Sequence, residues 1–440
     1  LGDVYKRQTY TQIKAEAQFL RALYYSYLIE LYGDVPLITD VLTLETGQQP
    51  RNPKSEVVDF ILKEYTEAAE NLPSTNNPTS GHATKGAALA LKARTALYNE
   101  RWQEAISASQ AVMTMEGTEY IIEDDYSKLF KYEGQTSKEV IFSVQYLLGT
   151  KVHALYRLFG SRNALAHTNK KPAYQLADTW ECIDGKQIDK SPMFDPKHPY
   201  ENRDPRLGYT LAVSGSEFLG FQFETHGDST KCWNYMTNQR VDNLEATHAY
   251  ATFTGICWRK YANIEDKDAL NDCDMNTILI RYPEVLLTYA EAKIKVGEID
   301  ASVLEAINKV RQRPSVKMPP ITTTDPNELF YAVARERKYE FSGEGLRLFD
   351  IRRWKIAETV MNQPLLGRMK KSYPDKAPRI DEWGTAFYEG IPIAESGESA
   401  DFKMRIVDIR KFDKNRDYLW PIPYIERQTN PNLTQNPNYE

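Results

Sequence analysis

The chain has 440 residues, of which 41% are hydrophobic and 26% are charged, and its formal net charge is −6. This length is too great for one ordinary core, so we expect one large domain or two closely joined ones. The negative charge and the lack of any basic run of five residues argue against nucleic acid as a partner, and no apolar run of 18 residues is present to cross a bilayer.

The first predicted element is a long helix that ends sharply, in the stretch from Ala15 to Leu37 (AEAQFLRALYYSYLIELYGDVPL). Gly33 can take the left-handed conformation that follows a helix, and Pro36 cannot continue one. Apolar residues recur at intervals of three and four, which predicts a single buried stripe along the helix. The residues of that stripe are Ile13, Ala17, Leu20, Tyr24, Tyr27 and Leu31.

Further helices are predicted in pairs. A second amphipathic helix, ended by Pro73, follows the first, with its apolar stripe at Val57, Ile61, Tyr65, Ala68 and Leu72. Residues 84–98 and 102–115 form an alanine-rich pair that resembles a tetratricopeptide (TPR) unit, in which small residues permit close helix contact. Similar pairs are predicted at 282–296 with 301–311, and at 328–341 with 346–360. Because one hairpin cannot bury its own apolar face, these pairs must pack together.

The segment between the helix pairs is less helical. Residues 140–146, 208–213 and 256–261 have strand-like composition, and stretches rich in Gly, Asn, Asp and Pro separate them. We therefore expect a mainly α fold: a TPR-like scaffold of about four helix pairs with a large, irregular, partly β insertion. The predicted regions are 9–135 and 136–440, the latter with the insertion at 140–275 and hairpins at 276–360, integrated as one compact unit.

Charged residues in the downstream helix predict an ionic network. Glu336, Glu340 and Glu344 repel one another at i,i+4 spacing, and Arg347, Arg352 and Arg353 are the cations expected to neutralise them. Arg203, Asp204 and Arg206 are expected to fix a turn. A glycosidase needs two carboxylates at a set separation, and no spacing singles out such a pair, so we predict no catalytic residues.

Metal and cofactor chemistry have no sequence signal. The four cysteines contain no CxxC pair, and the six histidines are scattered. This pattern argues against a metal site and a catalytic triad, and no cofactor is expected. Two alternatives stay open for the thiols, which are disulfides in an oxidising compartment or buried free cysteines.

Aromatic residues in the irregular segments are the best ligand-binding candidates. Aromatic faces stack on the C–H faces of sugar rings, while amides and arginines reach the hydroxyls. The first candidate cluster is Trp233, Asn234 and Tyr235, and the second is Phe159, Arg162 and Asn163. Trp180 and Trp383 complete the predicted set.

Several separated motifs, in order along the chain, resemble those of the SusD/RagB family. Beyond the first helix they are NRDPR (202–206), GICWRKY (255–261), RYPEVLLTYAEA (281–292), ARERKYEFSGEGLRLFDIRRW (334–354) and LWPIPYIERQTNPNLTQNPNY (419–439). Asn438 stands where the family commonly has Gly. The resemblance covers essentially the whole chain after about residue 11.

This resemblance implies a function. It implies non-catalytic binding of an oligosaccharide or polysaccharide at the cell surface, and delivery of that ligand to a SusC-like TonB-dependent transporter. It also implies an outer-membrane lipoprotein held by an N-terminal lipid anchor, whose signal and lipobox cysteine are not within this sequence. No ligand-binding residue is assigned from the resemblance, because the binding loops of the family diverge. The alternative functions are a TPR-type adaptor that binds proteins or peptides and, less favoured, a glycan hydrolase.

Overall fold

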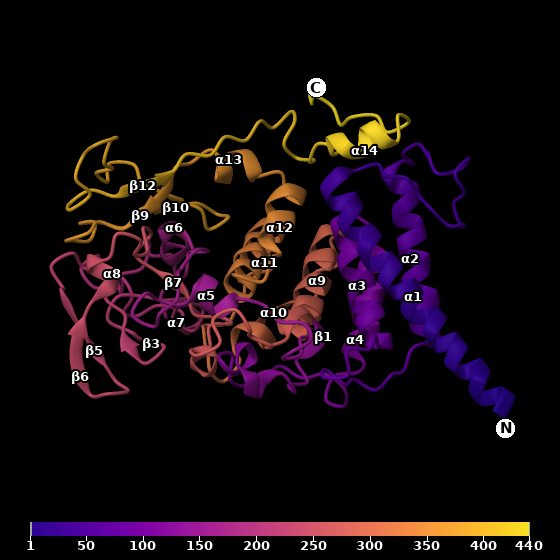
Figure 1. The fold of residues 1–440 in the computed structure, drawn as a ribbon, viewed down its shortest axis with the longest axis horizontal. Coiled ribbons are helices and arrows are strands. Elements are labelled where there is room, and N and C mark those ends of the chain that lie inside the picture. Colours follow the sequence, from indigo (N-terminus) through magenta and orange to yellow (C-terminus); the bar gives the residue numbers. More distant parts are fainter. Residues whose placement is uncertain (1, 440) are drawn as a thin grey trace.

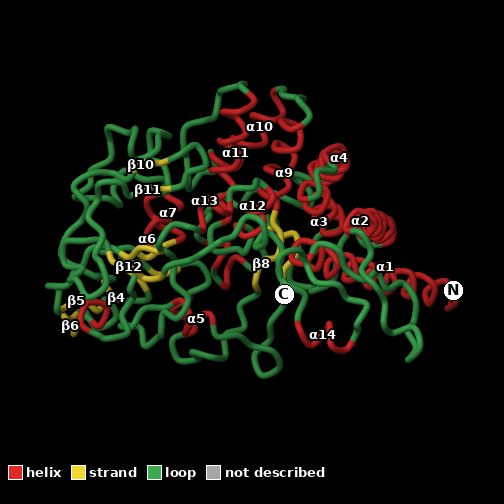
Figure 2. The backbone as a smooth tube through the Cα atoms, turned by 90° about the horizontal axis from the view of Figure 1, so that it is seen from above, coloured by secondary structure: helices red, strands yellow, loops and turns green. Residues whose placement is uncertain are grey.

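The computed structural model describes residues 2–439, with side chains from residue 8 onward. A helical scaffold occupies one end of the molecule, and short strands and long loops occupy the other (Figure 1). The view from above shows the same division, with α1 to α4 together, β5, β6 and β12 at the opposite end, and β8 beside the scaffold helices (Figure 2). The mainly α fold with a partly β insertion is therefore confirmed.

The helix pairs form the scaffold and match the predicted hairpins, except that the helix predicted at 346–360 is interrupted between Arg353 and Ala357, where Lys355 has φ +56°. They are α1 (Gly2–Tyr32) with α2 (Lys54–Asn71), α3 (Lys85–Tyr98) with α4 (Trp102–Met113), α9 (Tyr282–Lys295) with α10 (Ala301–Arg311), and α11 (Pro326–Phe341) with α12 (Arg347–Arg353). Residues from all of these pairs contribute to one large hydrophobic core. Local signals set the helix starts: the Thr84 hydroxyl accepts from the Ala87 amide, and Asp325 accepts from the amides of Asn327 and Glu328.

Short elements make up the insertion and the C-terminal part. The helices are α5 (Leu155–Phe159), α6 (Tyr174–Asp178), α7 (Pro205–Thr210), α8 (Leu244–Thr247), α13 (Ala357–Met361) and α14 (Tyr424–Thr429). Antiparallel pairs are β1 (Val140–Val144) with β8 (Thr277–Arg281), β2 (Leu211–Ala212) with β7 (Cys257–Trp258), β9 (Leu365–Gly367) with β12 (Arg405–Asp408), and β10 (Arg379–Ile380) with β11 (Ala386–Phe387). A four-stranded meander contains β3 (Glu217–Phe218), β4 (Phe221–Gln222), β5 (Lys231–Asn234) and β6 (Gln239–Asp242).

The predicted strand at 208–213 is wrong over its first half. The chain there is helical, in α7, because Asp204 caps the helix and Pro205 occupies its first turn. Only Leu211–Ala212 pairs as a strand. The prediction for 140–146 is confirmed by β1, and that for 256–261 is confirmed only at Cys257–Trp258.

The predicted buried stripe of α1 is wrong at most of its positions, although Tyr27 is half-buried and packs against the core. Ile13, Leu20 and Tyr24 are 56%, 41% and 64% exposed. The core instead receives Ala15, Phe19, Ala22 and Ile29, on the side of α1 that α2 covers. The helix carries apolar residues on two faces, and periodicity alone selected the face that these neighbours leave exposed.

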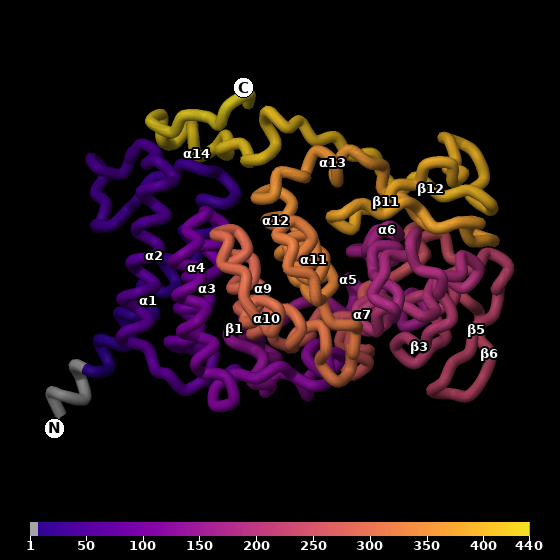
Figure 3. The backbone as a smooth tube through the Cα atoms, turned by 180° about the vertical axis from the view of Figure 1, so that it is seen from behind, coloured from indigo at the N-terminus to yellow at the C-terminus, as the bar shows by residue number. Residues whose placement is uncertain are grey.

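The C-terminal segment closes the fold onto the end of α1. It runs back along the molecule to the α1–α2 end (Figures 1 and 3). The Trp420 amide donates to the Leu31 carbonyl at 2.7 Å, and the Asn436 side-chain amide donates to the Tyr32 carbonyl at 3.0 Å. Asn438 has φ +64°, a left-handed conformation that Asn tolerates better than most residues, which explains why Asn can replace the family's Gly.

A buried ionic network joins the scaffold to the insertion. Glu340 on α11 accepts hydrogen bonds from Arg206 on α7 at 2.9 Å, from Arg281 at 2.5 Å and from Arg313 at 2.6 Å. The network extends through Lys260, Arg311, Asp204, Glu139, Glu181, Glu336 and Glu344. All of these side chains are buried. The predicted network therefore exists.

Its predicted partners are wrong. Arg353 forms ion pairs with Glu291 and Asp350 instead, and Arg352 donates to the Asp417 carbonyl. Arg347 lines a cavity. The cations that neutralise Glu336, Glu340 and Glu344 come from residues 206–313. The prediction that Arg203, Asp204 and Arg206 fix a turn is confirmed: Asp204 and Arg206 form an ion pair at 2.7 Å, and Arg203 donates to the carbonyls of Ala177, Trp180 and Pro199.

Candidate functional site

An open cavity of about 810 Å³ lies beside the strand meander. Tyr235 and Met236, from the turn after β5, line it and are 46% and 50% exposed. Tyr209 from α7 contributes a second aromatic side chain, and Glu217 and Lys131 contribute charged groups. The cavity therefore combines exposed aromatic surface with hydrogen-bonding groups of both signs.

Of the first predicted cluster, only Tyr235 lines this open cavity. Trp233 lies in β5, half-buried, opposite Arg240 of β6. Asn234 is buried, and its side-chain oxygen accepts from the amides of Met236 and Thr237 at 3.0 and 3.2 Å. Asn234 thus builds the turn that presents Tyr235.

The second predicted cluster lies elsewhere in the insertion. Phe159 is half-buried, with its ring centroid 6.4 Å from that of Trp258. The Asn163 side chain accepts from the Leu244 amide at 3.0 Å and donates to the Asp242 carbonyl at 2.7 Å. The Arg162 Nε donates to the Tyr250 carbonyl at 2.9 Å. These contacts hold the segment around α8 in place.

The two remaining predicted tryptophans pack against other aromatic rings. Trp180 is fully buried and stacks on Tyr339 of α11 with centroids 6.2 Å apart, so neither face of its indole meets solvent. Trp383 is half-buried and its ring contacts those of Phe330, Tyr331 and Trp354 at 5.0–5.6 Å. Their contacts are with the scaffold.

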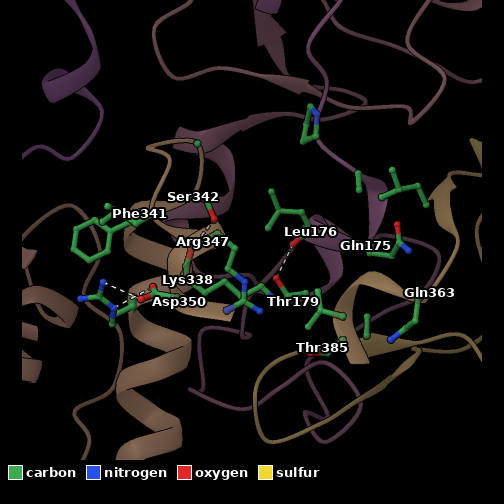
Figure 4. Close-up of a pocket in the computed structure, with 18 of the residues that line it drawn as sticks. Gln175, Leu176, Thr179, Lys338, Phe341, Ser342, Arg347, Asp350, Gln363 and Thr385 are labelled. Carbon is green, nitrogen blue, oxygen red and sulfur yellow. Dashed lines mark hydrogen bonds and ion pairs between the residues drawn. The ribbon is translucent and has the colours of Figure 1, made fainter. Parts of the chain in front are cut away.

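A second cavity of about 410 Å³, here called the basic cavity, was not predicted from the sequence (Figure 4). Arg347, Lys338 and Phe341 lie on its α11–α12 side, Leu176 and Thr179 come from α6, and Gln363 and Thr385 lie across from Phe341 and Asp350 (Figure 4). Because these residues come from segments far apart in the chain, no local motif marks them.

Burial changes the acid–base behaviour of two cations in this cavity. Burial lowers the pKa of Lys338 well below its ordinary value, with repulsion from Arg347 acting in the same direction. Burial also lowers the pKa of Arg347 to about 10, against the opposing attraction of Asp350 and Asp381. With a pKa of about 10, Arg347 still carries its positive charge at neutral pH.

Two carboxylates of the buried network, Glu340 and Glu344, are unsuited to proton donation. Neighbouring cations, chiefly Arg313, Arg281 and Arg206, overcome burial and lower the pKa of Glu340, and Arg281 and Lys260 do the same for Glu344. A glycosidase acid needs the opposite shift. Within the described part of the chain, no three His, Cys, Asp or Glu residues lie together as metal ligands would. Among residues 2–439, no helix has the length and apolar character needed to cross a membrane.

The fold defines a class: a TPR-like helical scaffold that carries a loop-rich, partly β insertion with open cavities. The protein-family model of the SusD family matches residues 138–439 of the sequence. A second family model, described as starch-binding associating with outer membrane, matches residues 3–97. The chain therefore belongs to the SusD family.

Relatives agree with this assignment. A SusD-like protein P2 from Formosa agariphila is 24% identical, over 97% of this chain and 74% of its own length. The crystal structure of a SusD-like carbohydrate binding protein from Bacteroides fragilis is 31% identical and superposes with a TM-score of 0.81, over 97% of this chain and 80% of that one. A second B. fragilis SusD-like protein is 27% identical with a TM-score of 0.76, over 98% and 80%.

Proposed function

We propose that this protein binds an oligosaccharide at the outer-membrane surface without cleaving it and delivers it to a SusC-like TonB-dependent transporter. Family membership supports the proposal, since one matching model is described as starch-binding associating with outer membrane. A structural neighbour at 31% identity is described as carbohydrate binding. The lipid anchor and the transporter partner rest on the family resemblance.

We propose the open cavity as the glycan site, and the exposed Tyr235 side chain carries this assignment. Its ring lies at a cavity of about 810 Å³, which is large enough for more than one sugar unit. Stacking on such a ring is worth about 0.5–1.5 kcal/mol beyond area burial. An affinity built from a few contacts of this size is modest, which suits a protein that must release its ligand to a transporter.

A glycan panel in affinity electrophoresis tests the site. Tyr235→Ala is expected to weaken retardation by the bound glycan about threefold to tenfold. Tyr424→Ala is the matched control, because Tyr424 is 69% exposed on α14 at the other end of the molecule. Trp233→Ala tests the neighbouring half-buried ring. Undiminished retardation in Tyr235→Ala would remove the open cavity as the site.

Two further measurements test the rest of the proposal. Incubation of the bound glycan with the purified protein is expected to leave its chain length unchanged, and shortened products would contradict non-catalytic binding. Co-purification from outer membranes, using an epitope on this protein, is expected to recover a TonB-dependent transporter. Recovery of the protein without any transporter would contradict delivery.

A further inference from the structure

Besides Arg337, which is paired with Asp350, the basic cavity is lined by four basic side chains from different segments. They are Lys171 before α6, Lys338 on α11, Arg347 on α12 and Arg410 after β12. The chain as a whole is acidic, with a net charge of −6, so this concentration of positive charge runs against its average. Positive side chains that share a partly enclosed cavity repel one another unless an anion neutralises them.

The cavity supplies no free carboxylate of its own. Asp350 is the one acidic residue in its lining, and it is already neutralised by Arg337 at 3.1 Å and Arg353 at 2.8 Å. Lys338 donates to the Gly384 carbonyl, which is neutral. Within the described residues, no hydrogen bond or ion pair engages the Arg347 guanidinium, although Asp350 and Asp381 attract it at longer range. The positive charge of the cavity is therefore uncompensated by direct contacts.

Unpartnered polar atoms at the cavity provide an independent observation. The Thr385 hydroxyl and the Nη1 atom of Arg337 have no hydrogen-bond partner among residues 2–439, and these residues are only 8% and 1% exposed. The Nε atom of Arg410, on a half-buried side chain, also has no hydrogen-bond partner among these residues. Buried polar groups are normally satisfied, so three such donors around one cavity indicate a ligand with several acceptor oxygens.

Apolar side chains give the cavity a second character. Leu176, Trp258, Phe341 and Leu346 line it together with the cations. An inorganic ion needs no such surface, whereas a sugar ring presents C–H groups to it and directs its charged substituent to the arginines. A volume of about 410 Å³ is near the lower end of ordinary ligand pockets.

We propose that the basic cavity binds a sugar unit that carries an anionic substituent, either a sulfate ester or a carboxylate. Arg347 and Arg410 contact the anion, Thr385 donates its hydroxyl to it, and Trp258 and Leu176 contact the ring. The inference rests on the proposed function only in that the anion belongs to a glycan. It adds a substrate class, acidic glycans, and a site separate from the open cavity.

Isothermal titration calorimetry tests this with four probes: a sulfated galactan oligosaccharide, an oligogalacturonate, a neutral galactan oligosaccharide and sodium sulfate. At least one charged oligosaccharide is expected to bind about tenfold or more tightly than the neutral one at low salt, and the advantage should shrink as salt screens the charges. Equal affinity for charged and neutral chains would overturn the proposal. Sodium sulfate binding as tightly as the sulfated oligosaccharide would overturn the sugar part of it.

Variants locate the binding. Arg347→Gln is expected to weaken the preferred charged oligosaccharide about tenfold or more, since it removes a charge-assisted hydrogen bond. Arg410→Gln, in the segment after β12, should have the same direction of effect and serves if the first variant fails to fold. Arg101→Gln, a half-exposed arginine on the scaffold paired with Asp59, is the matched control. Full affinity in both cavity variants would overturn the site.

The design separates this inference from the proposed function. The neutral oligosaccharide reports on the open cavity, and the charged ones report on the basic cavity. Charged binding that depends on Arg347, without any neutral binding, would support the inference and contradict the open cavity. The reverse pattern would overturn the inference and leave the proposed function standing.

Discussion

Glu340→Gln removes the central charge of the buried network while keeping the shape of the side chain. Glu340 is fully buried and accepts from Arg206, Arg281 and Arg313. An amide in its place leaves these guanidinium groups without their shared counter-charge. Breaking a buried ion pair by removing one partner costs about 3–5 kcal/mol. We expect the free energy of unfolding to fall by that amount.

The thermal shift follows from the chain length. An unfolding entropy of about 2.1 cal/mol/K per residue gives about 0.9 kcal/mol/K for the 440 residues. The melting temperature should therefore fall by about 3–5 °C in differential scanning calorimetry. Glu305→Gln is the control, because that side chain is 73% exposed and its one ion pair, to Lys309, spans 3.9 Å. Its effect should stay within about 0.5 kcal/mol.

The pH dependence of this difference tests the cause. The pKa of Glu340 is lowered in the folded state, so its stabilising contribution is complete above the unfolded value of about 4.3 and is lost as the pH falls toward the folded value. The difference between wild type and Glu340→Gln should therefore be constant above about pH 5 and shrink below pH 4. A difference no larger than that of Glu305→Gln, or one independent of pH in acid, would refute the reasoning.

Three further predictions concern other parts of the fold. Gly33→Ala should lower the free energy of unfolding in urea by about 1–2 kcal/mol, because φ is +73° there. Gly297→Ala is the control: φ is +77° and no neighbour lies within 4 Å, so this variant measures the backbone cost without the contact that Gly33 makes with Leu419. Burial raises the pKa of Asp178 to about 6, so the contribution of Asp178 to stability falls as the pH rises from about 4 to 6. The stability that Asp178→Asn gains over the wild type should therefore grow across that range to about 2–3 kcal/mol at pH 8, and a gain independent of pH in melts would contradict it. A thiol reagent should label no cysteine in the native protein and four after denaturation, because all four are buried and free, and native labelling would contradict the burial of Cys182, Cys232, Cys257 and Cys273.

The scaffold could be predicted from the sequence because its signals are local. The apolar spacing of Val57, Ile61 and Tyr65 located α2, and the same reasoning located α9. For α1 the period was right and the buried face was wrong, since Phe19 and Ile29 form an equally regular stripe. Which of two apolar faces is covered depends on neighbouring helices, and a single helix sequence does not contain that information.

The candidate sites depended on contacts between distant segments. Trp180 has the composition of a stacking residue, yet Tyr339, 159 positions later, covers it. Glu340 and its neighbours were correctly expected in an ionic network, but their cations come from residues 206–313 and left Arg347 to line a cavity. The division of the chain at residue 135 remains a prediction, as do the ligand residues.

The closure of the C-terminal segment onto α1 sets the order in which this protein can fold. The carbonyls of Leu31 and Tyr32 at the end of α1 accept from Trp420 and Asn436, about 400 residues later, and the Tyr32 carbonyl also accepts from Arg51. A ribosome makes α1 long before these partners, so the two contacts form only late in folding. Pairing between segments so distant in sequence slows folding relative to a fold built from local contacts.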